Sequence, residues 1–391
     1  MQKKVELYIF NPEHDMALAN FSPYYMPPQE IIHMKEDLCF LPVWYASEDS
    51  YISIYDKGII STFNGQISSF KRFSEERFVD DFPDSEIIPW GWNPSLVHSL
   101  LSSGVLEKQC PDTTKLERIH YLSGRQQCID VLDSLSSIEG TCGKAYQCNN
   151  ISDIKNLLNT HPQVVFKSPW SGSGKGLTFT SVSTWNDNIE KRLLRIIRSQ
   201  GCIMAEPVYN KVLDFAMEFY SDNNGSISFI GYSMFNTDAH GSYKSNILMS
   251  NELIEQRLSE YISSSILSEV RDSLIKKLGT MFSGDYTGYF GVDMMICDEN
   301  GRYLLHPCVE INLRMNMGVV SRILFDRYVK ESSTGKFAIE HYISDGEALA
   351  VHNERASRYP LVKDNDGKII SGYLPLTPII DSTRYAAYIY L

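Results

Sequence analysis

Two carboxylates and an amide occur at a spacing that could place them on one surface. Asp293 lies in the apolar run 292–297, which ends at the turn residues 298–301. A second extended run, 302–313, carries Glu310 and Asn312. Two extended runs around a turn of Asp, Glu, Asn and Gly predict a β-hairpin.

The register of this hairpin decides whether the three side chains meet. A two-residue loop would place Asp293 opposite Cys308, and a four-residue loop would place it opposite His306. Both registers put the later carboxylate and amide on the same face as Asp293, because strand side chains alternate with period two. A bulge at Pro307 or a three-residue loop would break this parity.

Oxygen ligands of this kind suit a hard cation. Two carboxylates and an amide oxygen favour Mg²⁺ or Mn²⁺ when phosphate oxygens complete the coordination shell. The alternative is a solvated hairpin face without a metal. The metal interpretation is favoured because Glu310 and Asn312 are embedded in apolar sequence, where an unpaired charge is costly.

Composition limits the class of protein. The chain has 391 residues, of which 43% are hydrophobic and 12% aromatic, and this is typical of a globular enzyme with two or three domains. Its formal charge of −12 argues against a nucleic-acid partner or an anionic membrane. No segment is long and apolar enough to span a bilayer.

Cysteine usage and the N-terminus favour a cytoplasmic protein. The eight cysteines show neither a CxxC pair nor zinc-like spacing, so we expect reduced core residues. The N-terminal apolar stretch is too short for a targeting segment. A homodimer is compatible with the sequence, which leaves the oligomeric state open.

The pattern of elements predicts an α/β (α+β) protein. An N-terminal α/β domain is expected over 1–110, with strands at 5–10, 38–45, 52–60 and 86–89 and a helix at 94–102. Residues 111–391 would form a second domain, beginning with a helix capped near Asp112. Within it, strands at 164–167 and 177–182 flank a glycine-rich loop, 236–250 reads as irregular, and 254–282 as a long helix broken near 263–265.

The glycine-rich loop runs from Ser168 to Gly176. It fits neither a Walker motif nor a dinucleotide fingerprint, because Pro169 stands where Walker glycine is needed and a strand follows the loop. Successive backbone N–H groups could instead form an anion-binding nest near Lys167 and Lys175. A flexible hairpin tip with two exposed lysines is the alternative.

The order of lysine strand, glycine loop, helix, acidic strand end, long helix and acidic hairpin resembles the ATP-grasp superfamily. The resemblance covers about residues 110–320, and residues 1–110 would be the pre-ATP-grasp-like domain that such enzymes carry. It implies a small lid subdomain at about 145–207 and a large subdomain at about 208–391. The segment Met204-Ala205-Glu206-Pro207-Val208-Tyr209 is similar to the family's adenine hinge.

The resemblance also implies roles for individual residues. Asp293, Glu310 and Asn312 would bind Mg²⁺ (or Mn²⁺), while Arg314 and Lys167 would act in catalysis. Glu206 and Val208 would contact the adenine. The full set implied to bind ATP comprises Lys115, Lys167, Gly172, Ser173, Gly174, Lys175, Gly176, Glu206, Val208 and Asp214.

The activity implied by the resemblance is an ATP- and Mg²⁺-dependent ligase. A carboxylate would be activated as an acyl phosphate and attacked by an amine, so the partners would be small-molecule acids and amines. Alternatives are a regulatory ATP-binding protein without turnover, or a kinase of a small acceptor. Arg314 could hold a carboxylate or the acyl phosphate, or form a structural ion pair with a metal ligand.

Two polar segments have no role in this scheme. The segment Asn11-Pro12-Glu13-His14-Asp15 follows the first strand, where α/β domains often bind ligands, and could hold part of a substrate. A local Asx-type turn is the alternative. His240, Tyr243, Lys244 and Asn246 could line a substrate site or belong to a plain polar loop.

Overall fold

The computed structural model describes residues 4–171, 176–222, 224–237 and 243–391. By its internal contacts the chain divides into two compact units. Unit 1 comprises Met1–Leu116, Lys244–Ser250 and Asn316–Leu391, and unit 2 comprises Glu117–Tyr243 and Asn251–Met315. The C-terminal segment thus groups with the N-terminal residues by its contacts, whereas it was predicted to belong to the second domain.

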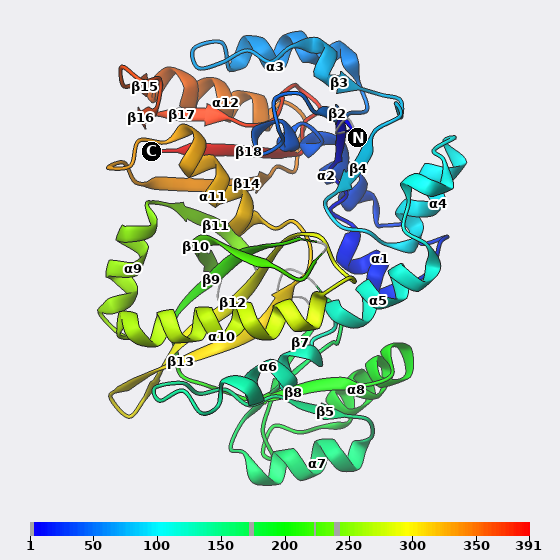
Figure 1. The fold of residues 1–391 in the computed structure, drawn as a ribbon, viewed down its shortest axis with the longest axis vertical. Coiled ribbons are helices and arrows are strands. Elements are labelled where there is room, and N and C mark those ends of the chain that lie inside the picture. The colour runs from blue at the N-terminus through cyan, green and yellow to red at the C-terminus, as the bar shows by residue number, and fades with distance from the viewer. Residues whose placement is uncertain (1–3, 172–175, 223, 238–242) are drawn as a thin grey trace. The chain divides into compact units, whose positions relative to one another are not determined.

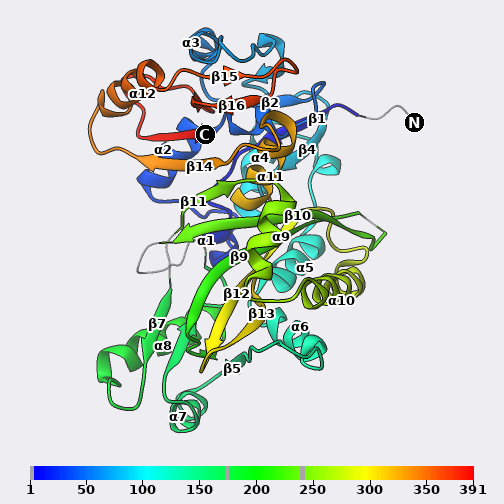
Figure 2. The ribbon, with the colours of Figure 1, turned by 90° about the vertical axis from the view of Figure 1, so that its left-hand side faces the viewer.

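A small parallel sheet forms the N-terminal part of unit 1 and confirms the predicted α/β region. Its strands are β1 (Glu6–Ile9), β2 (Tyr51–Ser53), β3 (Phe78–Val79) and β4 (Glu86–Pro89). The strand order is β3-β2-β1-β4 and all neighbours are parallel. Strands β1, β2 and β4 are labelled in Figure 2.

Helix α4 (Pro94–Ser102) packs against this sheet and contributes to its core. Leu7, Ile9 and Ile87 pack against Leu96 and Leu100 of α4. This helix begins at Pro94 because Asn93 Oδ1 accepts a hydrogen bond from the Leu96 N–H at 3.0 Å. The helices of this region are α1 (His14–Asn20), α2 (Gln29–Leu38), α3 (Ile60–Gln66) and α4 (Pro94–Ser102), with 3₁₀ turns at Leu41–Trp44, Lys57–Ile59, Glu75–Arg77 and Glu107–Gln109. Helix α5 (Thr113–Ser123) begins in unit 1 and continues into unit 2.

The strand predicted at 38–45 is wrong. Leu38 ends α2, and Leu41–Trp44 forms a 3₁₀ turn with Pro42 in its first turn. Every side chain from Leu38 to Trp44 is buried, so the apolar run has neither helix nor strand periodicity. Proline supplies no N–H to a strand ladder but fits the start of a helical turn.

The C-terminal part of unit 1 is built on antiparallel strands in the order β11-β14-β18-β17. It is tied to the N-terminal part by hydrogen bonds from Trp44 Nε1 to the Leu376 carbonyl at 2.6 Å and from Gln66 Nε2 to the Ile379 carbonyl at 2.6 Å. Its elements are β11 (Tyr243–Leu248), α11 (Met317–Tyr328), β14 (Gly335–His341), α12 (Glu347–Arg358), β15 (Val362–Lys363), β16 (Ile369–Ser371), β17 (Tyr373–Pro375) and β18 (Tyr385–Tyr390).

Strand β11 corrects the prediction that 236–250 is irregular. The sequence Tyr-Lys-Ser-Asn-Ile-Leu is too polar to predict a strand, yet it pairs antiparallel with β14. Asn246 and Leu248 are buried while Lys244 is exposed. The buried amide at Asn246 thus occupies an inward position that sequence periodicity alone assigns to an apolar residue.

Unit 2 contains a second antiparallel set with the order β13-β12-β9-β10. Helices α9 and α10 contact β10, and α6 contacts β13 (Figure 1). The predicted helix break is confirmed, because α9 and α10 are separate helices. The elements are α6 (Gln127–Leu135), β9 (Lys211–Ser221), β10 (Ile227–Thr237), α9 (Asn251–Ser259), α10 (Ser264–Phe282), β12 (Gly288–Glu299) and β13 (Arg302–Asn312).

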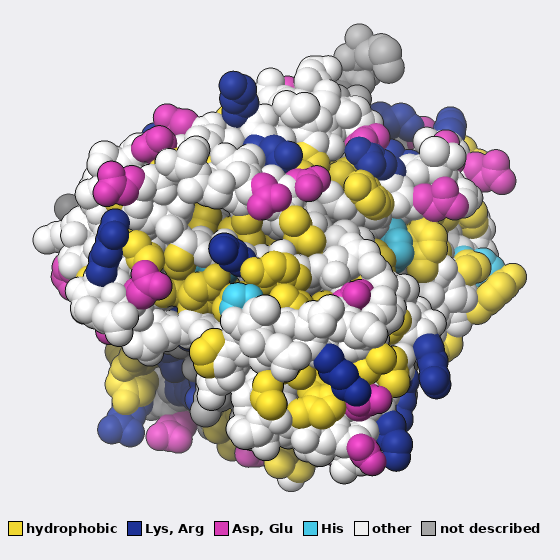
Figure 3. Space-filling model, turned by 90° about the horizontal axis from the view of Figure 1, so that it is seen from below, with side chains coloured by type: hydrophobic (Ala, Val, Ile, Leu, Met, Phe, Trp, Pro, Cys, Tyr) yellow, Lys and Arg dark blue, Asp and Glu magenta, His cyan; other side chains and the backbone are white. Residues whose placement is uncertain are grey.

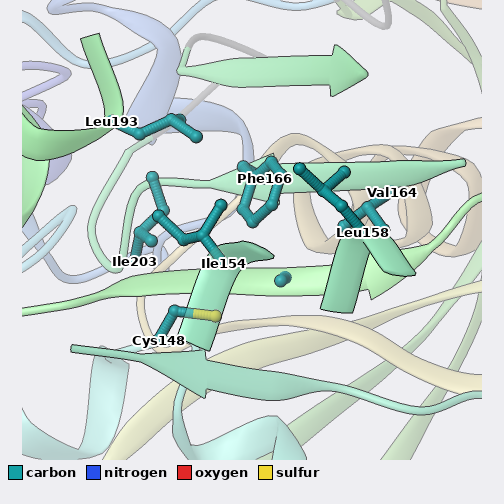
Figure 4. Packing of buried hydrophobic residues seen from close by; sticks show 8 residues of the cluster. Cys148, Ile154, Leu158, Val164, Phe166, Leu193 and Ile203 are labelled. Carbon is teal, nitrogen blue, oxygen red and sulfur yellow. The ribbon is translucent and has the colours of Figure 1, made fainter. Parts of the chain in front are cut away.

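The remaining part of unit 2 is an antiparallel sheet with the order β5-β8-β6-β7, called the lid sheet below. Phe166 and Val164 of β6 pack with Ile154 and Leu158 of α7 and with Leu193 of α8 (Figure 4). This apolar cluster fixes β6 against its neighbours. The elements are β5 (Tyr146–Cys148), α7 (Ile151–Thr160), β6 (Val164–Lys167), β7 (Leu177–Thr180), α8 (Asp187–Gln200) and β8 (Ile203–Pro207).

The cysteines, the charged side chains and the character of the helices complete the description of the fold. All eight cysteines are free thiols. Acidic and basic side chains are both scattered over the face drawn in Figure 3. None of the helices in the described ranges combines the length and the apolar character that crossing a membrane requires.

Candidate functional site

The predicted hairpin is present and its turn is the two-residue loop Asn300-Gly301. Both loop residues have positive φ, 57° at Asn300 and 87° at Gly301. This conformation is typical of the tight turns that match the twist of two paired strands, and Asn-Gly is the preferred sequence for it. The pairing of Glu299 with Arg302 follows directly.

The register differs from the one that a two-residue loop alone would give. Asp293 pairs with Glu310 instead of Cys308, because residues 307–309 face the single residue Met294. The irregularity lies at Pro307, which cannot donate to the ladder. Strand β13 thus has two extra residues at this point. Because two is an even number, Glu310 and Asn312 keep the same side of the sheet as Asp293.

The three predicted metal ligands therefore share one face. Asp293 and Glu310 are direct cross-strand partners, and Asn312 pairs with Gly291 two residues further along. Burial, together with the charges of Glu310 and Glu218, raises the pKa of Asp293 well above its ordinary value, while a hydrogen bond from Asn312 opposes the shift. A divalent cation between the two carboxylates would relieve this repulsion.

The donor set fits Mg²⁺ with phosphate oxygens as further ligands. Within the described residues, no three or more His, Cys, Asp or Glu side chains are grouped so that they could hold an ion by themselves. Asp293 and Glu310 would supply the carboxylates and Asn312 the amide oxygen. A cation that normally keeps several non-protein ligands suits such an incomplete set.

Glu218 is a functional candidate that was not predicted from the sequence. It pairs with Gly291 across β9 and β12, which places it on the same face as Asp293. It is only 1% exposed, and its Oε1 accepts a hydrogen bond from Ser233 at 2.7 Å. The signal was a single carboxylate inside the apolar strand Lys211–Ser221.

Arg125 is a second residue that was missed. Its guanidinium contacts Glu310 Oε1 at 2.7 Å and donates to the Ser168 carbonyl at 2.6 Å and to Ser171 Oγ at 2.7 Å. The side chain is 6% exposed. Arg125 thus joins the candidate metal ligand Glu310 to the start of the glycine-rich loop. No local motif marks it, since its partners are remote in sequence.

Lys167 and Glu206 form a buried ion pair on the lid sheet, with Nζ and Oε2 2.6 Å apart. Val165 pairs with Glu206 on the adjacent strands β6 and β8, so Lys167 projects from the same face one step along. The two side chains are 8% and 5% exposed. The structure therefore brings together two residues that the resemblance assigned to the nucleotide.

His306 lies against this pair. Its Nε2 is 4.0 Å from Glu206 Oε2, and its side chain is fully buried. Burial lowers the pKa of His306 to about 4, so the imidazole is neutral near pH 7. Neither ring nitrogen has a hydrogen-bond partner among the described residues. The sequence signal was a histidine within the apolar run 303–308.

The other predicted nucleotide residues are more dispersed. The backbone N–H of Val208 donates to the Gln163 carbonyl at 3.0 Å, and Asp214 forms an ion pair with Lys211. Lys115 lies in unit 1, on α5. Gly172, Ser173, Gly174 and Lys175 lie outside the described residues.

Gly176 and Arg314 complete the predicted set. Gly176 has φ of 87°, and a Cβ there would lie 2.8 Å from Ser168 Oγ, so only glycine fits without strain. Arg314 donates to Asn312 Oδ1 at 3.2 Å and to the Met315 carbonyl at 3.2 Å. The Asn312 oxygen is thus held by Arg314 while its amide nitrogen faces Asp293, so the amide would have to turn for its oxygen to reach a metal.

Comparison with known proteins finds likeness in structure only. No protein-family model matches the sequence, and no curated protein matches it. Biotin carboxylase from Campylobacter jejuni, solved as a β,γ-ATP complex, is 11% identical with a TM-score of 0.51, over 99% of this chain and 87% of that one.

Two further structures are similar. Rhizobium etli pyruvate carboxylase is 11% identical with a TM-score of 0.53, over 99% of this chain but only 35% of its own. N5-carboxyaminoimidazole synthetase from Staphylococcus aureus, complexed with ADP, is 13% identical with a TM-score of 0.48, over 100% and 94% of the two chains. The likenesses with TM-scores above 0.5 confirm that the chain has the predicted ATP-grasp fold.

Proposed function

We propose that this chain, whose fold is the ATP-grasp fold, is an ATP- and Mg²⁺-dependent ligase that joins a carboxylic acid to an amine. The observation that carries the proposal is the direct pairing of Asp293 with Glu310 on a face that also presents Asn312. Paired carboxylates held beside an oriented amide suit metal-bound phosphates better than a structural core. The ATP complex of the similar biotin carboxylase supports the choice of nucleotide.

The proposed reaction has two steps. A substrate carboxylate oxygen attacks the γ-phosphorus of ATP, and ADP leaves, which gives an acyl phosphate. The amine nitrogen then attacks the acyl carbon, a C–N bond forms, the C–O bond to phosphate breaks, and the amine loses a proton. When held by Asp293, Glu310 and Asn312, Mg²⁺ would supply positive charge that offsets the negative charge developing during phosphoryl transfer.

The chain's own residues would bind and orient. Lys167, which now pairs with Glu206, can turn its ammonium to a phosphate, because its side chain stands at the strand end where the glycine-rich loop begins. Arg314 fixes Asn312 and can offer its planar fork to an anionic oxygen. No protein nucleophile is required, since phosphoryl transfer depends mainly on positioning and charge.

The test is to measure ADP and phosphate release from Mg·ATP with a panel of acids and amines. A ligase releases both products only when the correct acid and amine are present. ADP without free phosphate would indicate a small-molecule kinase, and tight Mg·ATP binding without any product would indicate a regulatory ATP-binding protein. Either result would overturn the ligase proposal.

A homodimeric state and a cytoplasmic location stay predictions. Dependence on Mg²⁺ is tested in the same assay by replacing it with Mn²⁺ or by chelation. A ligase that uses the hairpin carboxylates should lose turnover on chelation and recover it with either cation.

A further inference from the structure

The segment Asn11–Asp15 lies at a position of unit 1 where open α/β sheets bind ligands. In the strand order β3-β2-β1-β4, the chain leaves β1 for β2 on one side and later returns to β4 on the other. The order therefore reverses between β1 and β4. Ligands of parallel sheets bind outside the carboxyl ends of the strands at such a reversal.

The segments that follow β1 and β4 are clamped together by buried polar side chains. Asn11 Nδ2 donates to the Gly91 carbonyl at 2.9 Å, and Asn11 Oδ1 accepts from the Gly91 N–H at 3.3 Å. His14 Nδ1 lies 3.5 Å from Asn93 Nδ2. Asn11, His14 and Asn93 are each at most 1% exposed. A local Asx-type turn would not bury so many polar groups against a second strand end.

Gly91 shows how closely these segments approach. A Cβ at this position would lie 2.5 Å from His14 Nδ1, so any larger residue would displace the imidazole. The position of His14, next to Glu13, is thus fixed by the segment after β4. A rigid arrangement of polar groups is what ligand binding without reorganisation requires.

Glu13, next to His14, has one carboxylate oxygen that is paired and one that is not. Its Oε1 accepts a hydrogen bond from Lys35 Nζ at 2.7 Å, and the residue is 5% exposed. Its Oε2 is buried and has no hydrogen-bond partner among the described residues. A buried carboxylate oxygen without a donor is costly, so a donor that is not part of the protein would stabilise it.

We propose that the carboxyl ends of β1 and β4 form a binding site for a small molecule with a primary amine, which donates to Glu13 Oε2. An ionised carboxylate only accepts hydrogen bonds, and an ammonium group gives the strongest ones. Lys35 does not fill this role, because its contact is with Oε1. The site lies in unit 1 and needs no ATP, so it stands whether or not unit 2 is a ligase.

The test measures binding of amines to the full-length protein without ATP. The probes are ammonium, ethanolamine and the proteinogenic L-amino acids, with ethylene glycol as the matched compound that lacks an amine. Thermal shift followed by calorimetry should find at least one amine that binds, while ethylene glycol does not. Glu13→Gln should weaken that amine about tenfold or more, because a charge-assisted hydrogen bond is lost.

Glu36→Gln is the matched control, since Glu36 is exposed on the same helix as Lys35. It should leave the affinity unchanged. Failure of every amine to bind, or equal binding to Glu13→Gln and the native chain, would overturn the proposal. Should Glu13→Gln not fold, a crystal of the native chain soaked with the binding amine decides. The amine nitrogen must then lie within about 3 Å of Glu13 Oε2, and a nitrogen elsewhere refutes the site.

Discussion

Glu13 in unit 1 and Glu310 in unit 2 each have one cationic partner at 2.7 Å, but they differ in what remains of the carboxylate. The side chain of Glu310 is 25% exposed, whereas that of Glu13 is 6% exposed and leaves Oε2 sealed without a donor. An anchored, partly exposed carboxylate can exchange ligands readily. A sealed one requires either a resident ligand or local opening before one can enter.

The largest effect should follow from removing the exposed carboxylate. Glu310→Ala deletes a candidate metal ligand, and we expect turnover with Mg·ATP to fall roughly 10²-fold or more. ADP and phosphate release measures it. Glu299→Gln is the control, since Glu299 is exposed on the neighbouring strand β12. Normal turnover of Glu310→Ala, with its fold intact, would contradict the assigned site.

Removing the cation that anchors Glu310 should chiefly affect stability. Arg125→Met leaves Glu310 unpaired beside a buried apolar side chain, and breaking such a pair costs about 3 kcal/mol of unfolding free energy. Urea denaturation measures the loss. Arg125→Lys should recover part of it, because lysine can reach one partner but lacks the fork that holds Ser168 and Ser171 as well.

A third prediction concerns the buried imidazole of His306, which lies beside Glu206. The pKa of His306 is lowered to about 4 by burial, below its ordinary value of 6.5. The unfolded chain therefore binds a proton first, so stability is present above pH 6.5 and is lost as the pH falls toward 4. The loss attributable to His306 should approach about 3 kcal/mol.

Denaturation at pH 7 and pH 5 of the native chain and of His306→Leu measures this difference. The variant should lose less stability between the two pH values, because it has no imidazole to protonate. His120, whose pKa is also lowered to about 4 by burial, remains in both proteins and so contributes equally. An identical pH dependence of the two proteins would show that the pKa of His306 in the folded chain is not lowered, and would contradict the prediction.

The smallest effect on stability should follow from removing the charge of Glu13. Glu13→Gln keeps the shape of the side chain and removes the charge that faces Lys35, which is 23% exposed and can turn toward water. We expect a loss of about 1 kcal/mol of unfolding free energy. Urea denaturation at pH 7 measures it. A loss as large as that for Arg125→Met would mean that Glu13 is chiefly a structural residue.

Local signals explain what the sequence could predict. The helix at 94–102 and the strand at 164–167 have the predicted bounds, because Asn93-Pro94 starts the first and the second is a short β-branched and aromatic run. The hairpin followed from Asn300-Gly301. Asp293, Glu310 and Asn312 could be selected as candidates because burying a polar group in an apolar strand costs free energy unless the group has a partner.

Residues defined by remote partners could not be predicted. Arg125 is one of many arginines until the fold places it on Glu310, and Glu218 gains meaning only through its pairing with Gly291. The division of the chain was equally hidden. Contacts such as Trp44 with Leu376 join residues from opposite ends of the sequence, which no local pattern reports.

Strand β13 has two residues more than β12 between the pairs Asp293–Glu310 and Met295–His306. The face on which Glu310 lies therefore depends on whether the number of extra residues is even or odd. Insertions of two residues preserve which side chains face the candidate site, whereas an insertion of one would turn Glu310 away from Asp293. Length changes near Pro307 should therefore be tolerated in pairs. Homologous chains that differ in length here should differ by even numbers wherever both carboxylates are kept.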